Sequence, residues 1–106
     1  MITATFLKRN QTFISVSVSG HAGFADAGQD VICASVSASV QMTANLLTEI
    51  YHLPAEIAVE GNRISISVAS IQNEHANLLL QGLFLQLQLL MEEAPDCIRI
   101  QVASAP

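Results

Sequence analysis

Residues 12–40 read TFISVSVSGHAGFADAGQDVICASVSASV, and this stretch decides the fold. In residues 12–19, isoleucine and valine alternate with phenylalanine and serine, which is the two-residue period of a strand with one core-facing side. Three glycines within residues 20–30 interrupt that pattern and indicate a mobile loop. From residue 31 onward the apolar spacing lengthens to that of a helix. A strand, a loop and a helix therefore follow one another directly.

The helical pattern runs from Val31 to about Tyr51. Asp30 suits the N-cap position, because a carboxylate can accept hydrogen bonds from the unpaired N–H groups of the first turn. Pro54 prevents any continuation of the helix. The predicted core-facing stripe consists of Ile32, Val36, Val40, Leu47 and Ile50.

The rest of the chain shows the same two apolar patterns, the two-residue period of a strand and the longer spacing of a helix. Strands are predicted at residues 2–8, on either side of a tight turn at Gly61–Asn62, and at residues 98–102. A second helix is predicted at residues 74–92. The order ββαββαβ lacks regular strand–helix alternation, so we expect an α+β fold. It has one mainly antiparallel or mixed sheet of about five strands with two packed helices, and residues 1–106 form a single domain.

The second helix is apolar around most of its circumference. Its main stripe spreads to Leu78, Leu85 and Leu89, and a helix of this kind usually has two neighbours. Charged residues make up only 12% of the chain, against about 25% in an average domain. We therefore expect a homodimer in which a second copy covers part of the apolar surface.

The charge balance excludes one class of partner. The formal net charge is -5 and the four basic residues are scattered, whereas a nucleic-acid binder usually carries a clustered basic face. No direct nucleic-acid binding is expected. An acidic surface is compatible with a basic protein as partner.

The sequence favours a cytoplasmic protein. Cys33 and Cys97 lack the spacing of a disulfide framework, and the N-terminus lacks the pattern of a signal peptide. The apolar run at residues 78–91 is shorter than the ~20 residues of a membrane span and contains three glutamines. No membrane association is expected.

Cys33 and His21 form the candidate catalytic pair. With Asp30 as the cap, Cys33 is the third residue of its helix, where unpaired N–H groups and the helix dipole favour a thiolate. Eleven residues separate His21 from Cys33, enough for the chain to return the imidazole to the sulfur. The imidazole can then take the thiol proton and return a proton to a leaving amine. Free N–H groups at the helix start offer a site for the oxyanion.

Two other interpretations of these residues exist. A cysteine near the start of a half-buried helix is commonly a small core residue. Metal binding is the other, but His21 and Cys33 supply only two ligands and the remaining histidines show no paired spacing. We predict neither a metal nor a cofactor.

The segment GHAGFADAGQDVICASVSA, residues 20–38, closely resembles the signature of the bacterial ribosomal-processing cysteine proteases. In that family Gly-His-Ala is followed by a glycine-rich stretch and then by Gly-x-Asp, two β-branched residues, Cys-Ala and a Val-Ser pair. The length and the order of elements agree across the whole chain.

The resemblance implies a specific reaction. Members remove a short N-terminal extension from large-subunit ribosomal protein number twenty-seven during ribosome maturation, cleaving after Phe. The family is dimeric and works with a Cys/His dyad, which corresponds here to Cys33 and His21. The aspartate and serine of the motif correspond to Asp30 and Ser37.

Several roles remain open at this stage. Asp30 either caps the helix only or also orients the imidazole, and Ser37 either lines the site or is small for packing reasons. The residues expected in a mobile loop that folds over the substrate are Gly20, Ala22, Gly23, Phe24, Gly28 and Gln29. The competing functions are a non-catalytic, ribosome-associated module that binds basic proteins and another thiol reaction such as acyl transfer.

Overall fold

The structure is a computed structural model that describes the backbone of residues 1–20 and 27–106, and the side chains of residues 1–20 and 31–106. The described part contains five strands, two long helices and one π-helical turn, in the predicted order. These are β1 (Ile2–Arg9), β2 (Thr12–Ser19), α1 (Ala27–Asn45), the π turn η1 (Leu46–Ile50), β3 (Glu56–Glu60), β4 (Arg63–Ser67), α2 (Glu74–Glu93) and β5 (Ile98–Ser104).

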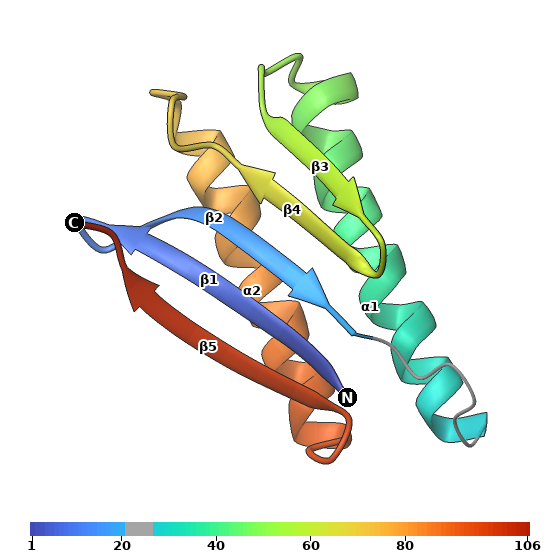
Figure 1. Ribbon diagram of the computed structural model, residues 1–106. Coiled ribbons are helices and arrows are strands. Elements are labelled where there is room, and N and C mark those ends of the chain that lie inside the picture. Colours follow the sequence, from blue (N-terminus) through green and yellow to red (C-terminus); the bar gives the residue numbers. More distant parts are fainter. Residues whose placement is uncertain (21–26) are drawn as a thin grey trace.

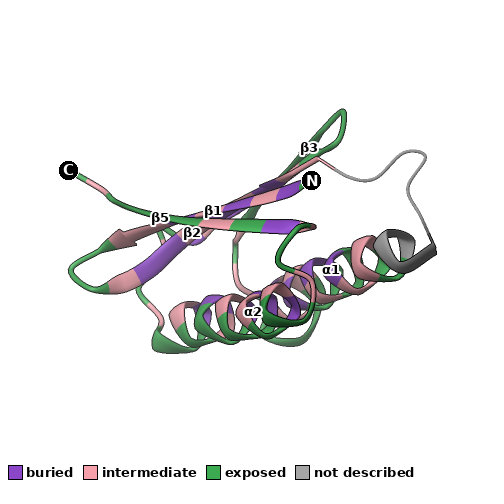
Figure 2. Ribbon diagram, turned by 90° about the horizontal axis from the view of Figure 1, so that it is seen from below, coloured by how far each residue is buried: buried purple, intermediate pink, exposed green. Residues whose placement is uncertain are grey.

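The five strands form one mixed sheet in the order β3-β4-β2-β1-β5. Only β1 and β5 pair in parallel, and every other neighbouring pair is antiparallel. Both helices lie on the same face of this sheet, which leaves the other face open (Figures 1 and 2). The predicted α+β class, the element order and the mixed five-stranded sheet are confirmed.

The hairpin of β1 and β2 contains a bulge that changes which residues face the core. Strict alternation predicts Phe13 on the face opposite Val16, but the register shifts after Leu7, so that Lys8 pairs with Phe13. The inserted residue turns Phe13 to the helix side. There its ring packs against those of Phe6 and Phe84, at centroid distances of 5.2 and 4.8 Å.

The first helix differs from its predicted form at its C-terminal end. A π turn replaces the last regular turn, with the Tyr51 N–H donating to the Leu46 carbonyl at 2.9 Å. This wider turn shifts the apolar stripe, so that Leu47 is fully buried while Ile50 is 66% exposed. The prediction that Ile50 faces the core was therefore wrong.

The core lies between the helices and the sheet. Its largest fully buried side chains come from both layers: Phe6, Val16, Val40, Leu47, Ile66, Val68, Leu80 and Leu87. By length and composition alone, the segment Val31–Ile50 is apolar enough to cross a membrane, with a mean hydropathy of 1.3. In this fold its apolar side packs on the sheet.

The outer side of α2 is also apolar, as the sequence predicts. Leu78, Leu85 and Leu89 are each about half exposed, and Met42 of α1 is exposed nearby. A groove of about 500 Å³ lies between the two helices, with Met42 and Leu78 among its lining residues.

Candidate functional site

Cys33 lies on the side of α1 that faces the sheet. Its side chain is partly buried and packs against the hydrophobic core, as do those of Ile32 and Ile64. Val36 and Val40, on the same helix face, are almost completely buried and hold this part of α1 in place. The sulfur is thus carried by a rigid element rather than by a loop.

A cleft of about 650 Å³ opens between the N-terminal half of α1 and the sheet. Cys33 and Ser37 lie on its helix wall, and Val18, Val59 and Ile64 supply an apolar wall from the sheet. A volume of this size is typical of a ligand pocket. The full lining is Ile2, Val18, Gly20, Cys33, Ala34, Val36, Ser37, Val40, Gln41, Val59, Gly61, Asn62, Arg63 and Ile64.

Ser37 stands one helical turn after Cys33 and lines the same cleft. Its hydroxyl oxygen accepts a hydrogen bond from Gln41 Nε2 at 2.9 Å. A hydroxyl group has one proton and two lone pairs, so this contact uses a lone pair and leaves the proton for another acceptor. Ser37 and Cys33 therefore face the same cleft, as expected from their spacing.

Gly20 forms the rim of the cleft at the end of β2. Its φ angle is +82°, and a Cβ atom on this residue would overlap the carbonyl oxygen of Met1. Any other residue would be strained and would also displace the start of β1. The residue that follows Gly20 along the chain is His21.

The start of α1 corrects two predictions. The described helix already includes Ala27, so Asp30 lies within the helix rather than at its N-cap, and Cys33 is not its third residue. Since residues 27–30 precede Cys33 within the helix, the N–H groups of the helix start do not lie at Cys33.

Three of the six residues expected in a mobile loop have a described backbone, and two of these three lie in a helix instead. Gly28 and Gln29 are part of α1, and Gly20 has a defined backbone at the end of β2. His21, Ala22, Gly23 and Phe24 lie outside the described residues.

The sequence did not indicate the β3–β4 hairpin as part of the site. Val59, Gly61, Asn62, Arg63 and Ile64 all line the cleft. They reach it because β4 pairs with β2, with Ile64 opposite Val18. No local sequence pattern in the hairpin indicates that it lines the cleft, because its position there depends on the order of the strands in the sheet.

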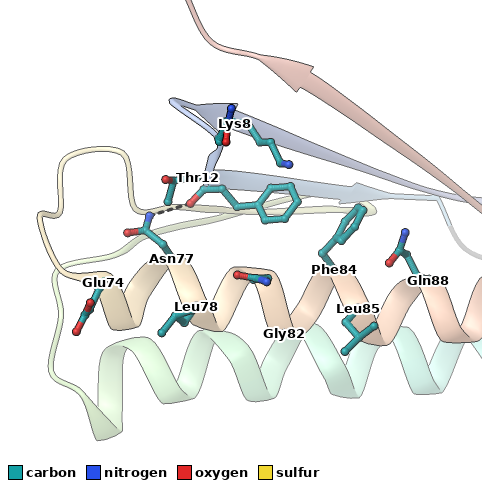
Figure 3. Close-up of a pocket in the computed structure, with 12 residues that line it drawn as sticks. Lys8, Thr12, Glu74, Asn77, Leu78, Gly82, Phe84, Leu85 and Gln88 are labelled. Atoms are coloured by element: carbon teal, nitrogen blue, oxygen red, sulfur yellow. Dashed lines mark hydrogen bonds between the residues drawn. The ribbon is translucent and has the colours of Figure 1, made fainter.

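A second, larger cavity of about 830 Å³ lies at the other end of β2 (Figure 3). Lys8 and Phe13 line it from the sheet, and Asn77 and Phe84 line it from α2. Asn77 Nδ2 donates to the Phe13 carbonyl at 2.9 Å, and Lys8 Nζ lies 4.8 Å from the centre of the Phe13 ring. None of the predicted site residues lines this cavity, so we take the smaller cleft at Cys33 as the candidate site.

The chain is similar to known proteases over almost its whole length. The profile of the family described as Cysteine protease Prp matches residues 1–99. The ribosomal processing cysteine protease Prp of Bacillus subtilis is 27% identical over 107 residues, which cover 94% of this chain and 96% of that protein. The protein of the same name from Staphylococcus aureus is 29% identical over 87 residues, which cover 80% of this chain and 82% of that protein.

Solved structures share the fold. A Streptococcus mutans protein has a TM-score of 0.88 at 27% identity, covering 99% of this chain and 96% of its own. The ribosomal processing protease Prp of S. aureus, in complex with a substrate peptide, has a TM-score of 0.84 at 26% identity, covering 96% of this chain and 99% of its own. The same protease has also been solved with a covalently linked product peptide. The present chain is therefore a cysteine protease that belongs to the Prp family of ribosomal processing enzymes.

Proposed function

We propose that this protease removes the N-terminal extension of large-subunit ribosomal protein number twenty-seven, cleaving after Phe with Cys33 as nucleophile and His21 as base. The observation that carries the proposal is the position of Cys33, which opens into an apolar cleft whose rim is formed by Gly20, the residue before His21. Gly20, which lines the cleft together with Cys33, is directly followed in the sequence by His21.

The reaction follows from these two groups. The imidazole of His21 takes the thiol proton of Cys33, and the sulfur attacks the scissile carbonyl carbon. The imidazolium then gives its proton to the leaving amine as the peptide bond breaks, which leaves a thioester on Cys33. Water, deprotonated by the imidazole, attacks the thioester carbonyl and releases the carboxylate product together with the thiol.

Ser37 and Asp30 have supporting roles in this proposal. The hydroxyl proton of Ser37, which the contact with Gln41 leaves available, stabilises the developing oxyanion one helical turn from Cys33. Asp30 precedes Cys33 by three residues on α1, and it orients the imidazole. The correction at the start of α1 supports the orienting role, because Asp30 is not the N-cap.

The cleft suits an aromatic side chain. Val18, Val40, Val59 and Ile64 present an apolar surface within the cavity that also contains Cys33. A large aromatic residue gains most from such a surface, since burying it removes roughly 150–250 Å² from water. Replacing Phe by Asp at the cut should therefore abolish cleavage of a peptide substrate.

A peptide that spans the extension and the mature N-terminus of the ribosomal protein tests the proposal. Wild-type enzyme should cleave it after Phe, whereas Cys33→Ala and His21→Ala should each lower kcat by about a thousandfold or more. Cys97→Ala is the matched control and should retain full activity. Unchanged cleavage by Cys33→Ala would remove this residue from the mechanism.

Thiol alkylation separates catalysis from a purely binding role. Iodoacetamide should modify Cys33 faster than Cys97, and His21→Ala should slow modification of Cys33 alone. Equal modification rates at the two cysteines, together with binding of the peptide without cleavage, would favour the non-catalytic module.

Both cysteines are thiols, and we propose the reducing cytoplasm as the compartment.

We also propose that the enzyme is a homodimer that packs through the outer side of α2. Leu78, Leu85 and Leu89 form an exposed ridge, and the groove beside Met42 is a complementary depression on the same surface. A two-fold axis at this surface would let the ridge of each copy enter the groove of the other.

Analytical ultracentrifugation tests this interface. Leu85→Glu should yield a monomer, because it buries two charges at the two-fold contact. Val102→Glu on β5 is the control, since Val102 is about as exposed as Leu85 but lies outside the proposed interface. A dimer that survives Leu85→Glu would rule out this surface.

A further inference from the structure

The strand β3 forms one edge of the sheet, next to the cleft. Within the described part of the chain its one strand partner is β4, and all five of its residues are exposed. In Figure 1 it lies along the side of the sheet that α1 backs. An edge strand carries a row of backbone N–H and C=O groups to which a further strand can pair.

The β3–β4 register shows which backbone groups face outward. Gly61 and Asn62 form a two-residue turn, and Glu60 lies opposite Arg63. In such a hairpin the residues that flank the turn exchange hydrogen bonds, and the pattern then alternates along the strands. The N–H and C=O groups of Ile57 and Val59 therefore point away from β4, toward the open edge.

The side chains of the same two residues face the helix side of the sheet. Val59 lies opposite Ile64 and lines the cleft, and Ile57 lies opposite the fully buried Ile66. Both remain substantially exposed, at 69% for Val59 and 38% for Ile57. Ile57 and Val59 thus combine apolar side chains with backbone groups that face the open edge, and this edge ends at the cleft that contains Cys33.

The opposite side of β3 is charged. The side chains of Glu56 and Glu60 alternate with those of Ile57 and Val59, so they project toward the open face of the sheet. Charges on an edge strand discourage pairing with a second copy of the same edge, because the two sets of carboxylates repel each other. The edge is therefore better suited to a different chain than to itself.

We infer that the substrate binds as an additional, extended strand along the free edge of β3, with alternate side chains entering the cleft at Val59. This inference rests on the proposed peptidase function and specifies how the peptide is held. Backbone pairing supplies affinity that does not depend on sequence, while the cleft selects the side chain next to the scissile bond. A strand held in this way presents its carbonyl groups in fixed order along the line that leads to Cys33.

N-methylation of the substrate tests the backbone pairing. A series of peptides carries one N-methyl group at each successive position around the cut, and binding is measured with the Cys33→Ala enzyme by fluorescence anisotropy. On one side of the scissile bond, affinity should fall about five- to tenfold at every second residue and stay nearly unchanged at the residues between. The wild-type enzyme should show the same alternation in kcat/KM.

Protein variants test the side-chain contact. Val59→Asp should lower kcat/KM for the Phe-containing peptide by at least about tenfold, because it places a charge in the apolar wall. The loss in kcat/KM should exceed any fall in the rate of Cys33 alkylation by iodoacetamide, which measures the direct effect of the new charge on the thiol. Val102→Asp, on the opposite edge of the sheet, should leave kcat/KM unchanged.

The outcomes separate the inference from the function on which it rests. If the unmodified peptide is cleaved but N-methylation has equal effects at all positions, strand addition is wrong and the protease assignment stands. A full-activity Val59→Asp enzyme would also overturn the inference. If the unmodified peptide is neither bound nor cleaved, the proposed substrate fails, and strand addition fails with it.

Discussion

Gly20→Ala should destabilise the protein by about 2–3 kcal/mol, a large fraction of the roughly 5–15 kcal/mol that stabilises a typical domain. Two costs add at this position. An alanine at a φ of +82° is strained by about 1–2 kcal/mol. Its Cβ would also overlap the Met1 carbonyl oxygen, so the start of β1 must move. That movement weakens the hydrogen bond from the Ile2 N–H to the Cys97 carbonyl, which measures 2.8 Å and contributes about 1 kcal/mol.

Gly61→Ala is the matched control for this variant. Gly61 has a φ of +60°, but a Cβ there meets nothing within 4 Å, so it should show the backbone strain alone, about 1–2 kcal/mol. Urea unfolding of both variants, with equal slopes, measures the difference. If Gly20→Ala proves no less stable than Gly61→Ala, the close approach of Gly20 to Met1 is not a constraint on the fold.

Three further substitutions test the packing away from the cleft. Gln11→Gly should stabilise the protein by about 1 kcal/mol in urea unfolding, because Asn10 and Gln11 both have positive φ in a two-residue hairpin turn that favours glycine at its second position. Phe84→Ala should cost about 3 kcal/mol in the same assay, since it removes one ring from a cluster of three; a loss below 1 kcal/mol would contradict this packing. Asn77→Asp keeps the shape of the side chain but removes the N–H donor to the Phe13 carbonyl, and it should lower the free energy of unfolding by about 1–2 kcal/mol. Thermal unfolding equal to that of wild type would show that this hydrogen bond is dispensable.

The sequence predicted the elements and their order because each has a clear period and clear ends. Gly61–Asn62 marks a hairpin, and residues 74–92 carry an apolar repeat that matches α2 within one residue. The bulge that turns Phe13 inward was not predictable, since a single inserted residue leaves the alternating pattern in the sequence intact. The same holds for the π turn, which changes the facing of Ile50 without a glycine or a proline to mark it.

The start of α1 was misplaced for a different reason. Asp30 is a good cap by residue type, but nothing in the residues before it forbids a helix, and α1 extends back to Ala27. The predicted proximity of Cys33 and Ser37 survived this error, because their spacing of one turn holds wherever the helix begins. The predicted stabilisation of the Cys33 thiolate by unpaired N–H groups was lost, because it requires Cys33 to lie in the first turn of the helix.

The site combines a local motif with a long-range contact, and only the first is visible in the sequence. Residues 20–38 contain the proposed catalytic pair, whereas most of the sheet wall of the cleft comes from the β3–β4 hairpin. That wall exists because β4 pairs with β2, so the end of the strand that leads toward His21 lies beside the start of β4, with Ser19 opposite Arg63. If a peptide reaches the sulfur along the edge of β3, as we propose, it contacts the hairpin, and we therefore expect substrate selection to depend on the sheet edge as well as on the proposed catalytic motif.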